Sequence, residues 1–306
     1  GRGGRMKIEA DTVEITSGVR FGKTTGAPVT LVIYNKDFEN WEKIMSIDPD
    51  DETDEKSFTK YRPGHADFAG SVKYNHKDLR NVLERSSARK TAIETAVGAV
   101  AKQILEEFNI RGYSRILQIG MAKEKEDFHT EIDRAKEEGD TLGGKFVIIY
   151  ENMPIGLGSY VHWDRMLDGR IAQAVMSIPA VKTVSIGNHH SYKLKGSDFH
   201  DEMFLENGKI VRETNNAGGI EGGMTNGENL QIFASMKPIP TLRKPLRTVD
   251  AATRTETEAH FERSDTCAVE ACAVVAEARI ACVLLNEILL KYGGDNFDEI
   301  MKNFYK

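Results

Sequence analysis

Apolar residues recur at helical spacing in two long stretches of the chain. In the first stretch, Ile93, Val97, Val100 and Ile104 follow one another at intervals of four, three and four residues. The second stretch, after residue 266, carries Ala271, Val274, Val275, Ala278, Cys282, Leu285 and Leu289 at the same kind of spacing. Residues spaced in this way share one face of a helix. We therefore predict a long helix within residues 81–107, beginning near residues 85–89, and a second one after residue 266.

Shorter stretches predict strands and one surface helix. Near the N-terminus, Val13 and Ile15 alternate with polar residues, which is typical of a strand with one covered face. Residues 29–34 and 146–150 are rich in residues that favour strands, and residues 170–184 indicate a helix followed by a strand.

Within the highly charged residues 122–138, only Phe128, Ile132 and Ala135 form a narrow apolar stripe, so we predict a surface helix there.

Two other stretches give loops rather than binding motifs. Residues 22–26 resemble the end of a phosphate-binding loop, but Ser17 stands where that motif needs glycine, and Pro28 and a strand follow instead of a helix. We interpret them as a hairpin turn. Residues 48–55 hold six carboxylates in eight positions, which predicts a solvated loop.

Composition limits the classes of function. The 306 residues carry a net charge of −6, which argues against a nucleic-acid or anionic-membrane binder. No apolar run approaches the roughly 20 residues that span a bilayer. Cys267, Cys272 and Cys282 have no metal-ligand spacing, so we expect no metal and read them as reduced core residues of a cytoplasmic protein.

The residues 62–67, Arg-Pro-Gly-His-Ala-Asp, are the strongest candidate for chemistry. Proline and glycine favour a tight turn, and the turn presents His65 between Arg62 and Asp67. Histidine changes charge near neutral pH, so this group can transfer a proton beside a bound anion.

Four further stretches are candidate anion or ligand sites. Residues 85–89, Arg-Ser-Ser-Ala-Arg, form either a phosphate site at a helix start or an ordinary helix cap. Residues 215–227 hold five glycines in thirteen positions, which suits close approach to a ligand or a flexible surface loop. Residues 237–241, Lys-Pro-Ile-Pro-Thr, form a stiff extended segment, and residues 263–265, Arg-Ser-Asp, precede the last long helix, where Asp265 is a cap or a site wall.

The order of these stretches resembles the chorismate synthase family, and residues 158–165 resemble its Gram-positive-type branch. The basic arm at residues 1–7 fits the same pattern. The resemblance implies an enzyme that converts 5-enolpyruvylshikimate 3-phosphate to chorismate and phosphate by an anti 1,4-elimination. It also implies dependence on reduced FMN, although the reaction has no net redox change.

The resemblance further implies roles for individual residues. His65 matches the histidine that supplies a proton to the flavin, and Asp265 matches the carboxylate that helps to deprotonate flavin N5. The expected substrate-binding residues are cationic: Arg2, Arg5, Arg62 and Arg89. The expected flavin contacts are Arg85, Ser86, Ser87, Ala180, Gly222, Lys237, Pro238, Ile239, Pro240, Thr241 and Arg263.

Several departures from the family pattern set limits to this interpretation. The chain has no match to a Gly-Glu-Ser-His-Gly segment near the family's N-terminus, and we expect that a segment precedes Gly1. Pro179, Thr183 and Glu270 replace common family residues around the expected flavin loops. Two alternatives stay open: a flavin- or anion-binding homologue without activity, and an enzyme with its own NADPH-dependent flavin reductase activity.

The resemblance finally implies an α/β fold. We expect a single domain over residues 1–306, built as a β-α-β sandwich with antiparallel sheets inside and helices outside. We also expect a homotetramer in the cytoplasm that binds neither nucleic acid nor membranes.

Overall fold

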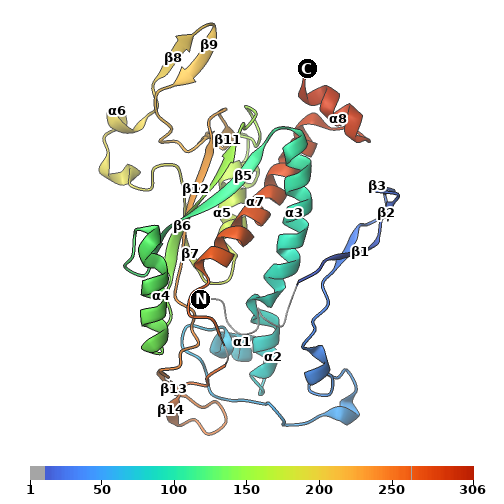
Figure 1. Ribbon diagram of the computed structural model, residues 1–306, viewed down its shortest axis with the longest axis vertical. Coiled ribbons are helices and arrows are strands. Elements are labelled where there is room, and N and C mark those ends of the chain that lie inside the picture. The colour runs from blue at the N-terminus through green and yellow to red at the C-terminus, as the bar shows by residue number, and fades with distance from the viewer. Residues whose placement is uncertain (1–10, 263) are drawn as a thin grey trace.

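The central element of the fold is a four-stranded antiparallel sheet (Figure 1). The computed structural model describes residues 11–262 and 264–306. The strands lie across the sheet in the order β5 (Arg111–Ile119), β6 (Gly144–Glu151), β12 (Leu230–Met236) and β7 (Val181–Ile186), and each neighbouring pair is antiparallel. The strands predicted at 146–150 and before residue 184 are confirmed as members of this sheet.

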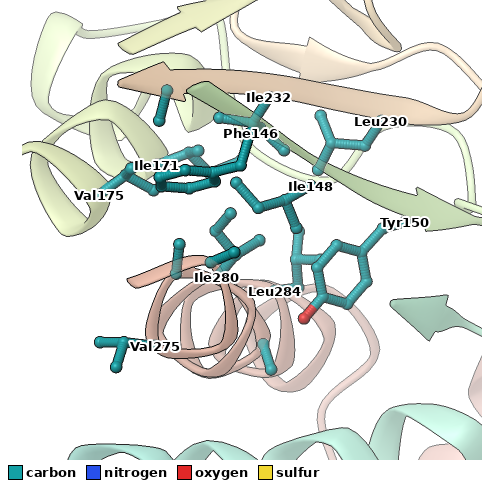
Figure 2. Close-up of a cluster of buried hydrophobic side chains, with 14 of the residues drawn as sticks. Phe146, Ile148, Tyr150, Ile171, Val175, Leu230, Ile232, Val275, Ile280 and Leu284 are labelled. Carbon is teal, nitrogen blue, oxygen red and sulfur yellow. The ribbon is translucent and has the colours of Figure 1, made fainter. Parts of the chain in front are cut away.

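The main hydrophobic core lies between one face of this sheet and two helices, α5 (Leu167–Met176) and α7 (Val269–Tyr292) (Figure 2). Its fully enclosed side chains are apolar and come from both layers: Phe146, Ile148, Ile171, Val175, Leu230, Ile232, Ile280 and Leu284. Tyr150 belongs to the same core and points its hydroxyl toward α7, where it donates a hydrogen bond to the carbonyl oxygen of Glu277 at 2.7 Å. Burial raises the pKa of Tyr150, so the hydroxyl stays protonated and remains a donor.

Helix α3 (Thr91–Glu107) crosses the outer side of α7, and both helices finish near α8 (Phe297–Phe304) (Figure 1). A Cβ built on Gly98 would lie 2.6 Å from the carbonyl oxygen of Ala278 and closer still to its Cα and Cβ. The two backbones therefore meet at this crossing, which only glycine at residue 98 allows.

The predicted helix exists, but the apolar face read from its spacing is not the face that packs inside this chain. Val97 and Val100 are 48% and 40% exposed, whereas Gly98, Ala101 and Leu105 are buried. The reason is the close approach to α7, because small side chains permit it and valines do not.

Helix α7 confirms the second predicted helix and part of its predicted apolar face. Val275 and Ala278 are buried as expected, whereas Val274 and Leu289 are exposed. Glu277 is buried instead, where Lys102 donates to its carboxylate at 2.7 Å and the Ser114 hydroxyl donates to the other oxygen. The buried carboxylate therefore has partners on α3 and β5.

The region of residues 62–91 departs from the prediction of one helix beginning near residues 85–89. Helix α1 (Asp67–Tyr74) packs on α2 (Arg80–Ser86), and a short 3₁₀ turn (Ala88–Lys90) separates α2 from α3. The break occurs because Ser87 is extended, with φ −57° and ψ 136°, and its side chain caps the 3₁₀ turn. The two serines therefore do not stand at the start of the long helix.

Two peripheral predictions are confirmed. Helix α4 (Phe128–Glu137) buries Phe128, Ile132 and Ala135 on its single apolar stripe. The hairpin of β2 (Val19–Arg20) and β3 (Lys23–Thr24) turns at Phe21 and Gly22, which both have positive φ, so the expected hairpin turn includes Gly22, and Lys23 and Thr24 form its second strand.

The remaining elements form small sheets and turns around the central layers. The sheets pair β1 (Glu14–Ser17) with β4 (Thr30–Val32), β8 (Met203–Glu206) with β9 (Lys209–Arg212), β10 (Ile220–Glu221) with β11 (Met224–Thr225), and β13 (Arg247–Val249) with β14 (Glu256–Glu258). Helix α6 (Gly196–Phe199) precedes the β8–β9 hairpin, which projects from the molecule (Figure 1). Residues 48–55 are exposed, as predicted, and include a 3₁₀ turn (Pro49–Asp51).

The described residues thus form a mixed α/β fold with antiparallel sheets and helices. None of the helices in this part of the chain combines the length and the apolar character that a membrane crossing requires.

Candidate active site

The predicted turn at residues 62–67 leads directly into α1. Gly64 has φ +80°, and the His65 N–H donates to the carbonyl oxygen of Arg62 at 3.1 Å, which closes the turn. His65 is partly exposed, whereas Arg62 and Asp67 are buried. The turn therefore presents an accessible imidazole above a buried ion pair.

The Asp67 carboxylate is the centre of this turn, and its side chain is 0% exposed. Oδ2 accepts from the Arg62 backbone N–H at 3.1 Å and from Nε at 2.8 Å. Oδ1 accepts from Arg62 Nη2 at 2.8 Å and lies 2.5 Å from His65 Nδ1. Burial alone raises the pKa of Asp67, but the hydrogen bonds from Arg62 and His65 outweigh it and hold the pKa well below its usual range. Asp67 is therefore ionised at any working pH.

A second layer of aromatic and charged side chains surrounds Arg62. The Phe58 ring lies 5.5 Å from the Arg62 guanidinium carbon and stacks on the His260 ring at 4.6 Å between centroids. Arg80 also lies over the Phe58 ring, 5.0 Å from its centroid, and pairs with Glu262 at 2.9 Å. These contacts tie residues 58–80 to the segment that ends just before residues 264–265. Spacing in the sequence gave no signal for them, because about 180 residues separate the partners.

The predicted segment 237–241 meets the turn at Lys237. Its ammonium donates to the Gly64 carbonyl oxygen, and its backbone N–H donates to the carbonyl oxygen of Ala180 at 2.9 Å. Burial, together with the nearby charge of Lys182, lowers the pKa of Lys237. Three of the predicted stretches, around Ala180, His65 and Lys237, therefore lie side by side.

The other end of the segment 237–241 meets residue 264. The Ser264 hydroxyl donates to the carbonyl oxygen of Thr241 at 3.1 Å, and Asp265 beside it is partly buried. The Ile239 carbonyl oxygen accepts from the buried Thr141 hydroxyl at 2.7 Å, which fixes the middle of the segment. The segment thus connects the His65 turn to the residues that precede α7.

Residues 85–89 join α2 to α3. Arg85 is exposed, the Ser86 hydroxyl donates to the carbonyl oxygen of Val82 at 2.6 Å, and Ser87 accepts from the Arg89 N–H at 3.3 Å. The Arg89 guanidinium donates two hydrogen bonds to the Asp11 carboxylate, of 3.0 and 2.5 Å. Arg89 is therefore placed to bind a carboxylate in the two-pronged way typical of guanidinium groups.

These hydrogen bonds do not join residues 85–89 to the cluster around His65 and Lys237, and four further predicted residues are not placed in that cluster by the described structure either. Gly222 lines a separate pocket of about 350 Å³ with Ile186, which is at the opposite end of β7 from Ala180. Arg2, Arg5 and Arg263 lie outside the described residues.

Comparison with known proteins identifies the family. Residues 1–289 match the family described as chorismate synthase. The chorismate synthase of Caldanaerobacter subterraneus subsp. tengcongensis is 52% identical over 306 residues, covering 99% of this chain and 85% of that protein. The chorismate synthase of Geobacter sulfurreducens is 48% identical over 339 residues, covering 99% of this chain and 86% of that protein. A crystal structure of a chorismate synthase superposes with a TM-score of 0.77 at 38% identity, covering 98% of this chain and 85% of that chain.

These similarities class the chain as an enzyme, a carbon–oxygen lyase that acts on a phosphate. The chain belongs to the chorismate synthase family. The resemblance read from the six sequence stretches is therefore confirmed, and the family's place is in aromatic amino acid biosynthesis.

Proposed function

We propose that this chain catalyses the anti 1,4-elimination of phosphate from 5-enolpyruvylshikimate 3-phosphate, giving chorismate, in a reaction that depends on reduced FMN. The observation that carries the proposal is the cluster at residues 62–67 and 237. It places an accessible imidazole beside a partly buried ammonium group, with Asp67 beneath the imidazole at 2.5 Å. Such a site can bind anions and move a proton.

Substrate binding is assigned to cationic side chains, because the substrate carries a phosphate and carboxylates. Arg89 binds the Asp11 carboxylate through both Nη1 and Nη2, and this bidentate geometry supports a role in binding a substrate carboxylate or phosphate. Arg62 has Nε and Nη2 on Asp67, so we assign its contribution to Nη1 and to its charge. Arg2 and Arg5 are proposed to complete the set.

The residues around Lys237 fit an FMN molecule. Burial and, to a smaller extent, the charge of Lys182 lower the pKa of Lys237, so a bound phosphate would stabilise the charged form of Lys237. Ala180 has φ +72°, a conformation that costs an L-residue about 1–2 kcal/mol. Strain of this kind is concentrated at functional sites.

We propose that FMN is held by Ala180, the 237–241 segment, Arg85, Ser86, Ser87, Gly222 and Arg263. When bound in its reduced form, the flavin supplies electron density for a reaction in which a poorly acidic hydrogen and a phosphate leave.

Two side chains of this chain are assigned to proton transfer. His65 Nε2 is the atom that donates a proton on the cofactor side of the site, because Nδ1 faces Asp67. The Asp265 carboxylate is the group that accepts one. The segment 237–241 links the two, since it contacts the His65 turn at Lys237 and the residue before Asp265 at Thr241.

The wider architecture of the protein is part of the proposal. We propose one domain over residues 1–306 with a β-α-β sandwich, assembled as a homotetramer that works in the cytoplasm. Exposed valines at 97, 100 and 274 lie on the two packed helices α3 and α7, and apolar side chains of this kind support a subunit contact there.

The experiment is an anaerobic assay with the intact chain, 5-enolpyruvylshikimate 3-phosphate and chemically reduced FMN. Phosphate and chorismate are expected in equal amounts, and no product is expected with oxidised FMN. FMN binding without any product would contradict the lyase assignment and favour a binding protein. Product formed with NADPH and oxidised FMN, without another reductant, would show a flavin reductase activity in the same chain.

A further inference from the structure

The Asp67 side chain is buried more completely than His65, which it contacts. Its hydrogen-bond donors are also unusual, because they precede the helix that Asp67 begins. Asp67 is the first residue of α1, directly after the N-cap residue Ala66, and a carboxylate at a helix start ordinarily interacts with the free N–H groups of the first turn. Here its four hydrogen bonds come from residues 62 and 65 instead, which precede the helix. Capping α1 is therefore not what this carboxylate does.

We propose that Asp67 is a positioning residue, which keeps the proton of His65 on Nδ1 and leaves Nε2 free to exchange a proton at the site. The role of Nε2 rests on the proposed function, but the location of the proton does not. Arg62 contributes by orienting Asp67, because it donates hydrogen bonds to both of its carboxylate oxygens.

The location of the proton follows from charge and distance. An ionised carboxylate oxygen and an unprotonated ring nitrogen both present lone pairs, and they would repel each other at the 2.5 Å that separates Oδ1 from Nδ1. Nδ1 therefore carries the proton both in the neutral ring and in the imidazolium. Arg62 Nη2 lies 3.0 Å from Nδ1 and has a second N–H that would serve an unprotonated Nδ1, but that arrangement would leave the 2.5 Å contact between Nδ1 and Oδ1 repulsive.

The carboxylate also offsets positive charge around the imidazole. Arg62 faces the ring from its own turn, Lys237 donates to the Gly64 carbonyl oxygen, and Lys182 lies near Lys237. The charge of Arg80, which lies over the Phe58 ring, is already paired with Glu262. Asp67 is thus the carboxylate whose charge offsets Arg62 and Lys237 next to His65.

The test begins with the unaltered chain, labelled with ¹⁵N in its histidines and without substrate. The two ring nitrogens of His65, assigned by comparison with His65→Asn, should show the tautomer with the proton on Nδ1. A spectrum dominated by the proton on Nε2 would overturn the proposal. This result is independent of turnover, so an inactive chain would contradict the proposed function without affecting it.

The second arm replaces the carboxylate by an amide in Asp67→Asn. The amide is neutral and can donate an N–H to an unprotonated Nδ1, so a larger share of the His65 rings should carry the proton on Nε2. In an active chain, kcat/KM should fall as that share rises, because a ring with its proton on Nε2 has the wrong tautomer for accepting a proton there.

The matched control is Asp201→Asn, which removes another buried carboxylate with several hydrogen bonds. It should lower stability without changing the His65 nitrogen signals. If Asp67→Asn lowers stability alone and leaves the tautomer and kcat/KM unchanged, Asp67 is only structural. Asp67→Glu, which keeps the carboxylate, should restore the Nδ1 tautomer at least in part.

Discussion

The close crossing of α3 and α7 predicts that a single methyl group added at residue 98 destabilises the fold. In Gly98→Ala, the added Cβ would lie 2.6 Å from the Ala278 carbonyl oxygen and nearer to its Cα and Cβ, well inside van der Waals contact. The clash is with backbone atoms, so no side-chain rotation relieves it and the helices must move apart. Overpacking of this kind costs about 1–3 kcal/mol, whereas alanine gains about 1 kcal/mol of helix propensity over glycine. Because the clash is with backbone, we expect the upper part of that range to apply and a net loss of up to about 2 kcal/mol in the free energy of unfolding.

The matched control is Gly169→Ala in α5, where the nearest atom to the new methyl is the Trp163 carbonyl oxygen at 3.8 Å. The same chemical change should stabilise the protein there by up to about 1 kcal/mol. Urea unfolding at equal protein concentration gives both values. Opposite signs are expected, and a Gly98→Ala protein as stable as Gly169→Ala would refute the backbone contact between the helices.

The crossing also affects the site, because α3 begins just after Arg89 and α7 begins just after Asp265. Pushing the helices apart at Gly98 should therefore lower kcat/KM more than Gly169→Ala does. The assay is phosphate release with reduced FMN.

Three further results are expected. The pKa of Asp67 is lower in the folded chain than its ordinary value of 3.8, so the ionised Asp67 stabilises the fold above that pH. Below about pH 4, the free energy of unfolding should therefore fall more steeply in the parent than in Asp67→Asn, as measured by urea unfolding at a series of pH values. Lys237→Met should weaken binding of reduced FMN by at least about tenfold in anaerobic titrations, since a charge-assisted hydrogen bond contributes about 1.5–3 kcal/mol, and unchanged binding would place the phosphate elsewhere. Tyr150→Phe should lower the free energy of unfolding by about 1 kcal/mol in urea, because it removes the hydrogen bond to Glu277 but keeps the ring in the core.

The sequence was most informative where local spacing decides the structure. The stripe of Phe128, Ile132 and Ala135 predicted α4 and its buried face, because a surface helix has only one layer to contact. The same reasoning found α3 but chose the wrong face for packing, since Val97 and Val100 match the helical period while Gly98 makes the contact. The periodicity of large apolar side chains predicts which face of a helix is hydrophobic. Where two helix backbones touch, however, the contact face must carry small residues such as glycine and alanine.

The site was predictable in its parts but not in its assembly. The hexapeptide at 62–67 indicated proton transfer, because its residue types lie close together in the sequence. The contacts of Lys237 with Gly64 and of Arg80 with Glu262 join residues 173 and 182 positions apart, and no local pattern records them. The break at Ser87 was also missed, because two adjacent serines suit the end of one helix as well as the start of another.

The central claim is that His65 transfers a proton in an FMN-dependent lyase. The most direct test is the rate of phosphate release from 5-enolpyruvylshikimate 3-phosphate at saturating reduced FMN, compared between His65→Ala and His129→Ala, which alters an exposed histidine on α4. Acid–base catalysis by a positioned side chain contributes about 10²–10⁴-fold, so we predict a loss of that size in His65→Ala and a parental rate in His129→Ala. A His65→Ala protein that binds reduced FMN and releases phosphate at the parental rate would contradict the account.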